Sequence, residues 1–342
     1  MEDRDVKSAQ VATRLDCDLA VEVLRRSTDN PSAFLAMNQR NALFATPEID
    51  GFVCYRAVGK YWVQFGGPFA AAPDRPALLR RFLDEARARR RRVLAVQVQQ
   101  ADARIYAELG MRVNQAGASY AVDLATMSLK GKKFVSLRNK ISRAKRAGLK
   151  VTEIYSSAFA DGYSEVIADI DHRWLREKGK HVKELEFLIG EIGGPAQKYR
   201  RLFVGSIDDA PVGYLSYAPV YGSHGGWLHD LSRRVPEAPP GVMEAINLHA
   251  IEQFRDNGAD WLHFGFTPFT SLDPSYELPT ASKPVSRIVR LLADKGELVY
   301  PAKTQLEYKL KWNPTAVIPE YIAYKSLTPR AIWSLIRATN SI

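Results

Sequence analysis

One order of predicted elements occurs twice along this 342-residue chain, and it restricts the fold more than any single motif does. Each copy has two strands joined by a short turn, a second turn rich in glycine or proline, a helix and a further strand. The first copy runs from Gly51 to Val98 and the second from Leu202 to Gly265. Little sequence identity links them. Helices that alternate with strands favour a sheet covered by helices, so we predict an α/β (α+β) protein made of two copies of one unit.

The first copy shows clear turn and helix signals. Apolar and aromatic residues alternate on both sides of Val58-Gly59-Lys60, which predicts a hairpin. Gly66-Gly67-Pro68 ends the second strand, and Pro76 opens a helix that runs to Arg90. Proline is well tolerated in the first turn of a helix, where its missing N–H would have no partner. A buried strand is predicted to follow over residues 93–98.

The second copy places charged residues at the end of a predicted strand. His229 and Asp230 lie in an apolar stretch, the pair Arg233-Arg234 follows, and Pro239-Pro240 opens a long amphipathic helix. Polar groups at a strand end beside a helix N-terminus are well placed to receive anions and oxyanions. Two interpretations stay open for Asp230 and the arginines, namely an active site and a surface turn held by salt bridges. His229 is interpreted as a packed strand residue rather than a base.

The segment between the two copies is strongly basic. Residues 131–150 hold eight basic and no acidic side chains. A helix over Lys133–Ala147 would place Phe134, Leu137, Ile141 and Ala144 on one side and the basic residues on the other. Such a helix favours an anionic partner, either a phosphate backbone or anionic lipid. We therefore predict an N-terminal domain over residues 1–130, a basic linker helix over 131–150 and a C-terminal catalytic domain over 151–342.

Composition narrows the functional class. The chain has a formal net charge of +10, which also favours anionic partners. Its two cysteines, Cys17 and Cys54, and six scattered histidines do not have the spacing of a zinc site or a disulfide framework. The opening MEDRDVKSAQ lacks the features of a targeting peptide, and no apolar run is long enough to span a bilayer. The expected location is the cytoplasm, with peripheral contact at the inner membrane face left open.

Several motifs, taken in order, resemble the soluble synthase domain of the lysyl- or alanyl-phosphatidylglycerol synthases of the multiple peptide resistance factor type. That domain consists of two fused acyltransferase folds of the GNAT kind. The resemblance extends from about residue 40 to residue 325. The motifs are WVQFGGPFA at 62–70, LRNKISRAKRAGL at 137–149, HDLSRRVPEAPPGVMEAI at 229–246, LHFGFTPF at 262–269 and GELVYPAKTQLEYKLKWNP at 296–314. Within them, Asp230, Arg233, Glu297 and Lys311 match charged motif positions of the family.

The resemblance implies transfer of an aminoacyl group from aminoacyl-tRNA to an acceptor hydroxyl, commonly on a lipid head group. Because that ester is already activated, the reaction requires no cofactor, and aminoacyl-tRNA is the co-substrate. On this hypothesis Asp230 orients or deprotonates the acceptor, Lys311 stabilises negative charge at the ester, and Glu297 holds the aminoacyl ammonium. Substrate binding would use Arg233, Arg234 and Tyr308, the two arginines by contacting phosphate. The acceptor stem would lie on the basic helix, on Lys133, Arg138, Lys140, Arg143 and Lys145.

Other readings stay open. The family usually has an aspartate at the position of Gly67 and a glutamate near Ser119, and these departures leave the acceptor less certain than the donor. A soluble metabolite or peptide could therefore accept the aminoacyl group. An acyl-CoA N-acyltransferase is a second alternative, although its pyrophosphate-binding glycine spacing is missing from residues 67–78 and 234–243. A third is a non-catalytic binder of nucleic acid or membranes, which would act through residues 131–150 alone.

Overall fold

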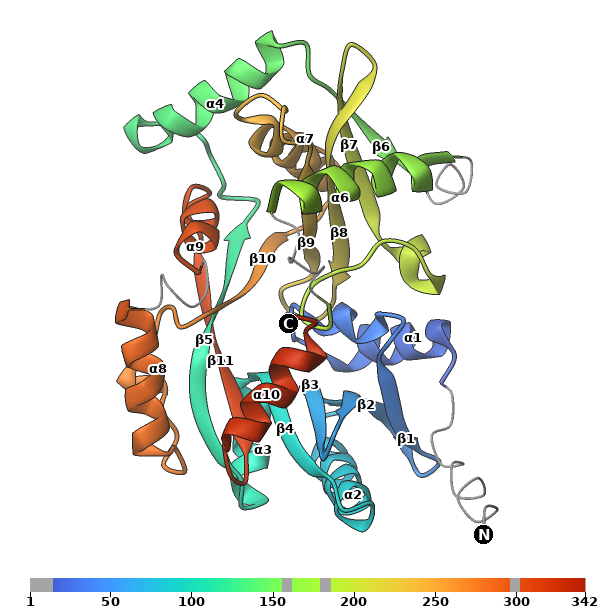
Figure 1. The fold of residues 1–342 in the computed structure, drawn as a ribbon, viewed down its shortest axis with the longest axis vertical. Coiled ribbons are helices and arrows are strands. Elements are labelled where there is room, and N and C mark those ends of the chain that lie inside the picture. Colours follow the sequence, from blue (N-terminus) through green and yellow to red (C-terminus); the bar gives the residue numbers. More distant parts are fainter. Residues whose placement is uncertain (1–14, 156–161, 179–185, 296–301, 342) are drawn as a thin grey trace.

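A computed structural model of the chain describes residues 15–155, 162–178, 186–295 and 302–341 (Figure 1). The strands are β1 (Ala42–Thr46), β2 (Ile49–Val58), β3 (Tyr61–Ala70), β4 (Arg92–Gln99), β5 (Arg112–Asp123), β6 (Lys150–Ile154), β7 (Arg201–Ile207), β8 (Ala210–Val220), β9 (Gly226–Arg234), β10 (Trp261–Pro268) and β11 (Ala316–Tyr324). The longer helices are α1 (Cys17–Ser27), α2 (Arg75–Ala88), α3 (Gln100–Glu108), α4 (Val135–Arg146), α6 (Ser164–Lys178), α7 (Val242–Asp256), α8 (Lys283–Lys295), α9 (Ala302–Leu310) and α10 (Pro329–Ala338). Short 3₁₀ helices are η1 (Ala33–Met37), η2 (Lys132–Phe134), η4 (Pro195–Tyr199) and η5 (Pro274–Tyr276).

Both predicted copies are present. Strands β2 and β3 form the first hairpin, followed by α2 and β4, and β7 and β8 form the second, followed by β9, α7 and β10. Within each copy the strands on either side of the helix run parallel, β3 with β4 and β9 with β10. The periodicity of the sequence was informative for the helices, because α2 and α7 each bury one apolar face.

The two copies share one mixed sheet of eleven strands, in the order β1-β2-β3-β4-β11-β5-β10-β9-β8-β7-β6. The strand nearest the C-terminus, β11, lies between β4 of the first copy and the following strand β5, and is antiparallel to both. Strand β5 in turn pairs with β10 of the second copy. The halves are therefore connected by sheet hydrogen bonds as well as by the basic segment, which the sequence pattern did not indicate.

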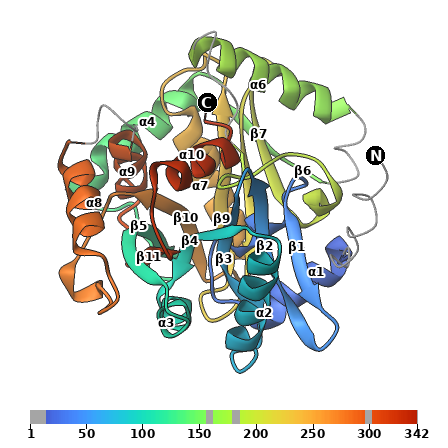
Figure 2. The ribbon, with the colours of Figure 1, turned by 60° about the horizontal axis from the view of Figure 1, so that its bottom comes forward.

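Helices cover both faces of the sheet (Figures 1 and 2). In the first half, α2 and α3 pack on one face through a core that includes Phe82 and Tyr106. On the other face α1, η1 and α10 surround a second core that includes Phe65. In the second half, side chains of β8 reach helices on both faces of the sheet. Tyr214 donates a hydrogen bond to Asp171 of α6, and Tyr217 donates one to Asn247 of α7.

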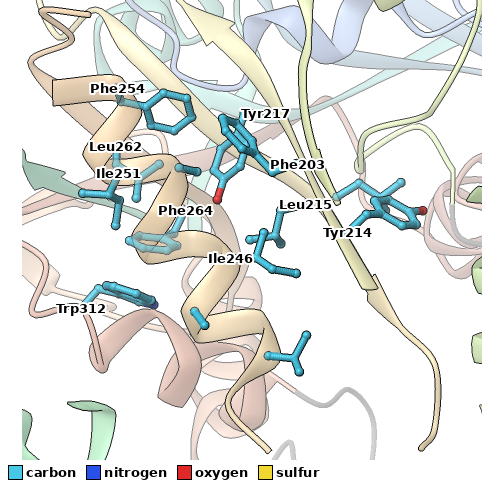
Figure 3. Packing of buried hydrophobic residues seen from close by; sticks show 14 of the residues in the cluster. Phe203, Tyr214, Leu215, Tyr217, Ile246, Ile251, Phe254, Leu262, Phe264 and Trp312 are labelled. Carbon is cyan, nitrogen blue, oxygen red and sulfur yellow. The ribbon is translucent and has the colours of Figure 1, made fainter. Parts of the chain in front are cut away.

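The largest core lies in the second half, between the sheet and α7 (Figure 3). Phe203 meets Tyr217 and Phe254 edge-on, with ring centroids 5.7 and 5.8 Å apart. Phe264 of β10 stacks on Trp312, which follows α9, at 6.3 Å. Burial of each large apolar side chain stabilises the fold by about 1.5–3 kcal/mol, so this cluster holds α9 and β10 together firmly.

The predicted basic helix is confirmed as η2 followed by α4. Phe134, Leu137, Ile141 and Ala144 are all buried, and α4 packs on α7. The contact is close at Gly241, whose φ is +96°, because a Cβ there would lie 2.0 Å from the Lys140 carbonyl oxygen. Within the described ranges no helix combines the length and the apolar character that crossing a membrane requires.

Candidate active site

The neighbouring strands β9 and β10 separate, and a cavity of about 350 Å³ opens where they part. They pair in parallel only over Gly226–Leu228 and Trp261–His263. Beyond that point Gly265 adopts a φ of +66°, which turns β10 away. Both halves of the molecule contribute to the wall: Ser32 and Leu35 of η1, Gln97 of β4, Leu188, Ile189, Leu228–Ser232, Phe264–Phe266, and Thr304, Gln305, Tyr308 and Lys309 of α9.

At one side of this cavity Asp230 forms a buried ion pair with Arg200. The Arg200 Nε lies 3.6 Å from the Asp230 Oδ2, and the two side chains are 0% and 1% exposed. Burial raises the pKa of Asp230 to about 6, while the Arg200 charge opposes that rise. The guanidinium is itself held, since its Nη2 donates to Asn38 Oδ1 at 3.1 Å and its plane lies over the Phe34 ring.

Gly190 covers the Asp230 carboxylate. A Cβ at Gly190 would lie 2.2 Å from the Asp230 carboxyl carbon, so only glycine fits there. Leu188 and Ile189, which precede Gly190, line the cavity. Asp230 also lines it although its side chain is 1% exposed, so the residue borders the cavity mainly through its backbone and its carboxylate is nearly sealed off.

Lys309 of α9 supplies a positive group on the cavity wall. Its Nζ donates to the carbonyl oxygens of Gly265 and Phe266, at 2.7 and 3.0 Å. These carbonyls lie where β10 has left β9, so the lysine satisfies acceptors that the interrupted sheet leaves unpaired. Burial lowers the pKa of Lys309 to about 7, and the nearby Glu320 opposes this. Glu320 is also buried and accepts a hydrogen bond from the Ser119 hydroxyl. Desolvation raises the pKa of Glu320 to about 7.

An aromatic group completes the wall. The ring of His229 lies 5.6 Å from that of Tyr308 and 5.8 Å from that of Phe264, centroid to centroid. Burial lowers the pKa of His229 to about 3, so its imidazole is neutral at physiological pH. Burial raises the pKa of the Tyr308 hydroxyl, which therefore stays protonated. Both groups can exchange hydrogen bonds with a ligand without adding charge.

Of the predicted site residues, Asp230 and Tyr308 come together at this cavity. Lys311 is not among the lining residues, because its Nζ lies 3.1 Å from the Glu244 Oε1 on α7. Glu297 lies outside the described residues. Of the three predicted catalytic residues, the described part of the structure thus places Asp230 at the cavity and Lys311 away from it.

The two predicted phosphate-binding arginines point elsewhere. Arg233 is buried against α6, where its Nη1 lies 3.0 Å from Asp171 Oδ2 and its guanidinium covers the Trp174 ring. Arg234 donates to the carbonyl oxygens of the next two residues along the chain. Neither lines the cavity, and the surroundings of Arg233 give it a structural role in attaching α6 to β9.

The basic residues of α4 and η2 fall into two groups. Arg138 donates to the carbonyl oxygens of Leu129 and Gly131, and so closes the turn that begins the helix. Lys140 lies 3.8 Å from Glu244 and is partly buried. The other three predicted tRNA-binding residues are exposed: Lys133, which donates to Asn313 at 3.0 Å, and Arg143 and Lys145, which form no ion pair within the described part of the chain. Lys132 and Arg146 of the same two elements are exposed as well.

Sequence reasoning missed Arg200, Gly190 and Lys309. Lys309 and Lys311 were both visible in the motif YKLKW, but only Lys311 matched a charged motif position of the family. The motif lies at the end of a helix, in which residues two apart lie on nearly opposite sides. Consequently only Lys309 faces the cavity. Arg200 and Gly190 carried no local signal, because their partner Asp230 lies 30 or more residues away.

The chain was compared with known proteins. A family model described as "Phosphatidylglycerol lysyltransferase, C-terminal" matches residues 21–324. The phosphatidylglycerol lysyltransferase of Bacillus subtilis is 22% identical over 320 residues, which are 93% of this chain and 36% of that protein. The lysylphosphatidylglycerol biosynthesis bifunctional protein LysX of Mycolicibacterium gilvum is 27% identical over 67% of this chain and 20% of its own length. The chain thus spans about a third or less of these relatives.

Two solved structures have a similar fold. The C-terminal domain of a putative lysylphosphatidylglycerol synthetase from Agrobacterium fabrum superposes with a TM-score of 0.76 at 22% identity, over 94% of this chain and 95% of that one. The structure of L-PGS from Bacillus licheniformis gives 0.76 at 19% identity, over 95% and 96%. The predicted α/β (α+β) class, a mixed sheet flanked by helices, is confirmed.

Within the described ranges no cluster of three or more histidine, cysteine, aspartate or glutamate side chains could hold a metal ion.

Proposed function

Because the chain belongs to the phosphatidylglycerol lysyltransferase C-terminal family, we propose that it moves an aminoacyl group from aminoacyl-tRNA to a hydroxyl of a phosphatidylglycerol-type lipid head group. The observation that carries this proposal is the cavity between β9 and β10, which has the buried Asp230–Arg200 pair on one side and Lys309 on another. Opposite charges fixed around a small cavity suit the polar transition state of ester aminolysis or alcoholysis.

The size of the cavity supports an aminoacyl ester as the group that enters. Its volume of about 350 Å³ lies at the lower end of small-ligand pockets, which are about 300–1,000 Å³. A tRNA body must therefore stay outside. Three exposed cations of α4 and η2, Lys133, Arg143 and Lys145, are proposed to hold its phosphates. This set is smaller than the sequence-predicted one, because Arg138 closes the turn that begins the helix and Lys140 is partly buried beside Glu244.

Asp230 is proposed as the proton acceptor. A pKa raised to about 6 makes the carboxylate a stronger base while leaving it mostly ionised at neutral pH. The acceptor oxygen attacks the ester carbonyl carbon and its proton passes to Asp230. The tetrahedral oxyanion then collapses, the bond to the ribose oxygen breaks, and that oxygen takes the proton back from Asp230. Contact between the hydroxyl and Asp230 requires Gly190 and its neighbours to shift, as catalytic hydrogen bonds often form only in the substrate complex.

Lys309 is proposed to stabilise the oxyanion, the role that the motif analysis gave to Lys311. Its ammonium has three N–H groups, and two of them are used by the Gly265 and Phe266 carbonyls. The third is available to an ester oxygen at the cavity wall. The transfer of this role from Lys311 rests on geometry, since Lys311 is paired with Glu244 outside the cavity.

A partition experiment tests the donor and the acceptor together. The protein is incubated with a mixture of radiolabelled aminoacyl-tRNAs, phosphatidylglycerol vesicles and an aqueous cell extract, and label is counted in each phase. We expect label in the lipid phase, dependent on intact aminoacyl-tRNA. Label confined to the aqueous phase would favour a soluble metabolite or peptide acceptor, and transfer from acyl-CoA instead of aminoacyl-tRNA would overturn the donor assignment.

A further inference from the structure

Helix α10 carries two large apolar side chains that the fold leaves in solvent. Ile332 and Trp333 are 47% and 55% exposed, whereas Ala331, Ser334 and Ala338 of the same helix are buried against the sheet. The helix is anchored independently of the two exposed residues, because the Thr328 side chain accepts a hydrogen bond from the Ala331 N–H at its start. Adjacent exposed tryptophan and isoleucine on one helix indicate a surface that meets an apolar environment.

The charged residues of α10 and of its flanking sequence are all positive, and the nearby Glu186, whose N–H donates to the Thr339 carbonyl after α10, is already paired with Arg40 and Arg56. Arg330 and Arg337 lie on α10, Lys325 precedes it, and no acidic residue occurs from Lys325 to the end of the sequence. Arg330 and Arg337 lie three and four residues from Trp333, so they border it on the helix surface. In the part of the chain that the structure describes, these three cations form no ion pair. Their charge is therefore available to an anionic partner.

A second helix repeats the pattern on the same face of the sheet. On α8, Ile288 and Leu291 are 57% and 52% exposed, and Arg287 beside them is exposed as well. Val285 of α8 and Leu335 of α10 pack against the same buried cluster, so both helices cover one face (Figures 1 and 2). That cluster also includes Leu35 of η1, which lines the candidate active site. The two helices and the cavity thus border the same buried cluster.

We propose that α10, together with α8, docks this protein on the surface of an anionic lipid bilayer. Trp333 and Ile332 insert among the head groups, and Arg330 and Arg337 contact lipid phosphates. Tryptophan suits this boundary because its ring is apolar and its N–H is polar, and an amphipathic helix with a basic border binds anionic membranes in this way. The proposal deepens the proposed function, since a lipid acceptor must be reached at a membrane. All of α10 lies beyond residue 324, where the family match ends.

Vesicle binding tests this surface without any assay of catalysis. The full chain is sedimented with vesicles of pure phosphatidylcholine and with vesicles that contain phosphatidylglycerol. We expect binding to the anionic vesicles, and at least a 10-fold loss of affinity in the double variant Ile332→Ser/Trp333→Ser. The matched control is Tyr155→Ser, which removes a 67% exposed side chain next to the edge strand β6 and should bind as the wild type does. Equal binding by the double variant would overturn the proposal.

A second measurement reports how deeply Trp333 inserts into the bilayer. Phosphatidylglycerol brominated on its acyl chains should quench tryptophan fluorescence in the wild type, and Trp333→Phe should lose that quenching. Quenching that is unchanged in Trp333→Phe would contradict insertion of α10. If the double variant instead abolishes a concentration-dependent self-association, seen by sedimentation in the absence of lipid, and vesicles do not bind, the surface is a contact between copies and the bilayer proposal fails.

Activity then separates this inference from the proposed function. The double variant should lose at least 10-fold in transfer to phosphatidylglycerol in vesicles, yet keep wild-type transfer to a short-chain, monomeric phosphatidylglycerol. Equal losses on both acceptors would contradict a docking role. If the wild type transfers nothing to either lipid, the proposed function fails, while vesicle binding and quenching still decide the docking proposal.

Discussion

The Asp230 carboxylate and the Arg200 guanidinium face each other across 3.6 Å, with both side chains almost sealed from solvent. They come from β9 and from the residue that precedes β7, so folding must bring two strands of the second half together before the pair exists. A buried pair of this kind seldom adds stability over an apolar replacement, although removal of one partner is expensive. Its presence beside a cavity is therefore better explained by chemistry than by stability.

This relationship predicts how substitutions combine. Arg200→Met should lower the free energy of unfolding by about 3–5 kcal/mol, because it leaves a buried carboxylate without its partner. The double variant Arg200→Met/Asp230→Leu should recover most of that loss while staying inactive. Urea unfolding measures both. Lys198→Met serves as control, because Lys198 and Asp18 form a solvent-screened surface pair whose loss should change the free energy of unfolding far less than Arg200→Met does. Additive destabilisation in the double variant would contradict the pairing.

Substitution of the two lysines should have unequal effects. Lys309→Met removes the cation at the cavity wall and should lower kcat by about 10²–10³-fold, as removal of an oxyanion donor does in other enzymes. Lys311→Met removes a partner of Glu244 outside the cavity and should change kcat by less than about threefold. Thermal unfolding of both variants shows whether each is folded. A larger loss in Lys311→Met than in Lys309→Met would return the catalytic role to Lys311.

The exposed cations of η2 and α4 should govern the salt dependence of tRNA use. Replacement of Lys133, Arg143 and Lys145 by alanine removes three proposed phosphate contacts. The KM for aminoacyl-tRNA should rise, and the slope of log(kcat/KM) against log[salt] should flatten by about 2–3. Arg138 is kept, because its bonds to Leu129 and Gly131 shape the helix start.

The control for that experiment is a pair of exposed arginines on the other half of the molecule. Arg80→Ala/Arg81→Ala on α2 lowers the net charge by two without touching α4. This double variant should leave the slope of log(kcat/KM) against log[salt] nearly unchanged. If it flattens the slope as much as the triple variant of η2 and α4 does, total charge, rather than the surface of α4, attracts the tRNA.

The sequence predicted the local elements well and the long-range contacts poorly. Both hairpins, α2, α4 and α7 follow from turn residues and apolar periodicity, which act over a few residues. The position of β11 between β4 and β5 does not, because strand order depends on pairing between distant segments. The residues of the candidate site also divide into those that local motifs predict and those that depend on distant contacts. Asp230 and Tyr308 stood out in motifs, whereas Gly190 has meaning only once the Asp230 carboxylate is placed against it.

Glu320 should make stability depend on pH. Burial raises its pKa from about 4.5 unfolded to about 7 folded, so the folded state binds the proton more tightly than the unfolded state. The favourable contribution of Glu320 to the free energy of unfolding is fully present below pH 4.5 and is lost as the pH rises through 7. Glu320→Gln, which cannot ionise, should therefore gain stability relative to the wild type as pH increases from 4.5 to 7. Denaturant unfolding at several pH values measures this difference, and a constant difference would contradict a raised pKa.

The pH dependence of single-turnover transfer tests the central claim most directly. With aminoacyl-tRNA and phosphatidylglycerol, the wild-type rate should rise with pH through an inflection near 6, where Asp230 ionises, and fall again above about 7 as Lys309 loses its proton. Asp230→Asn, verified as folded by circular dichroism, should lose about 10²–10⁴-fold in rate and show no inflection near pH 6. A folded Asp230→Asn enzyme that keeps the wild-type rate and the same acidic limb would contradict the assignment.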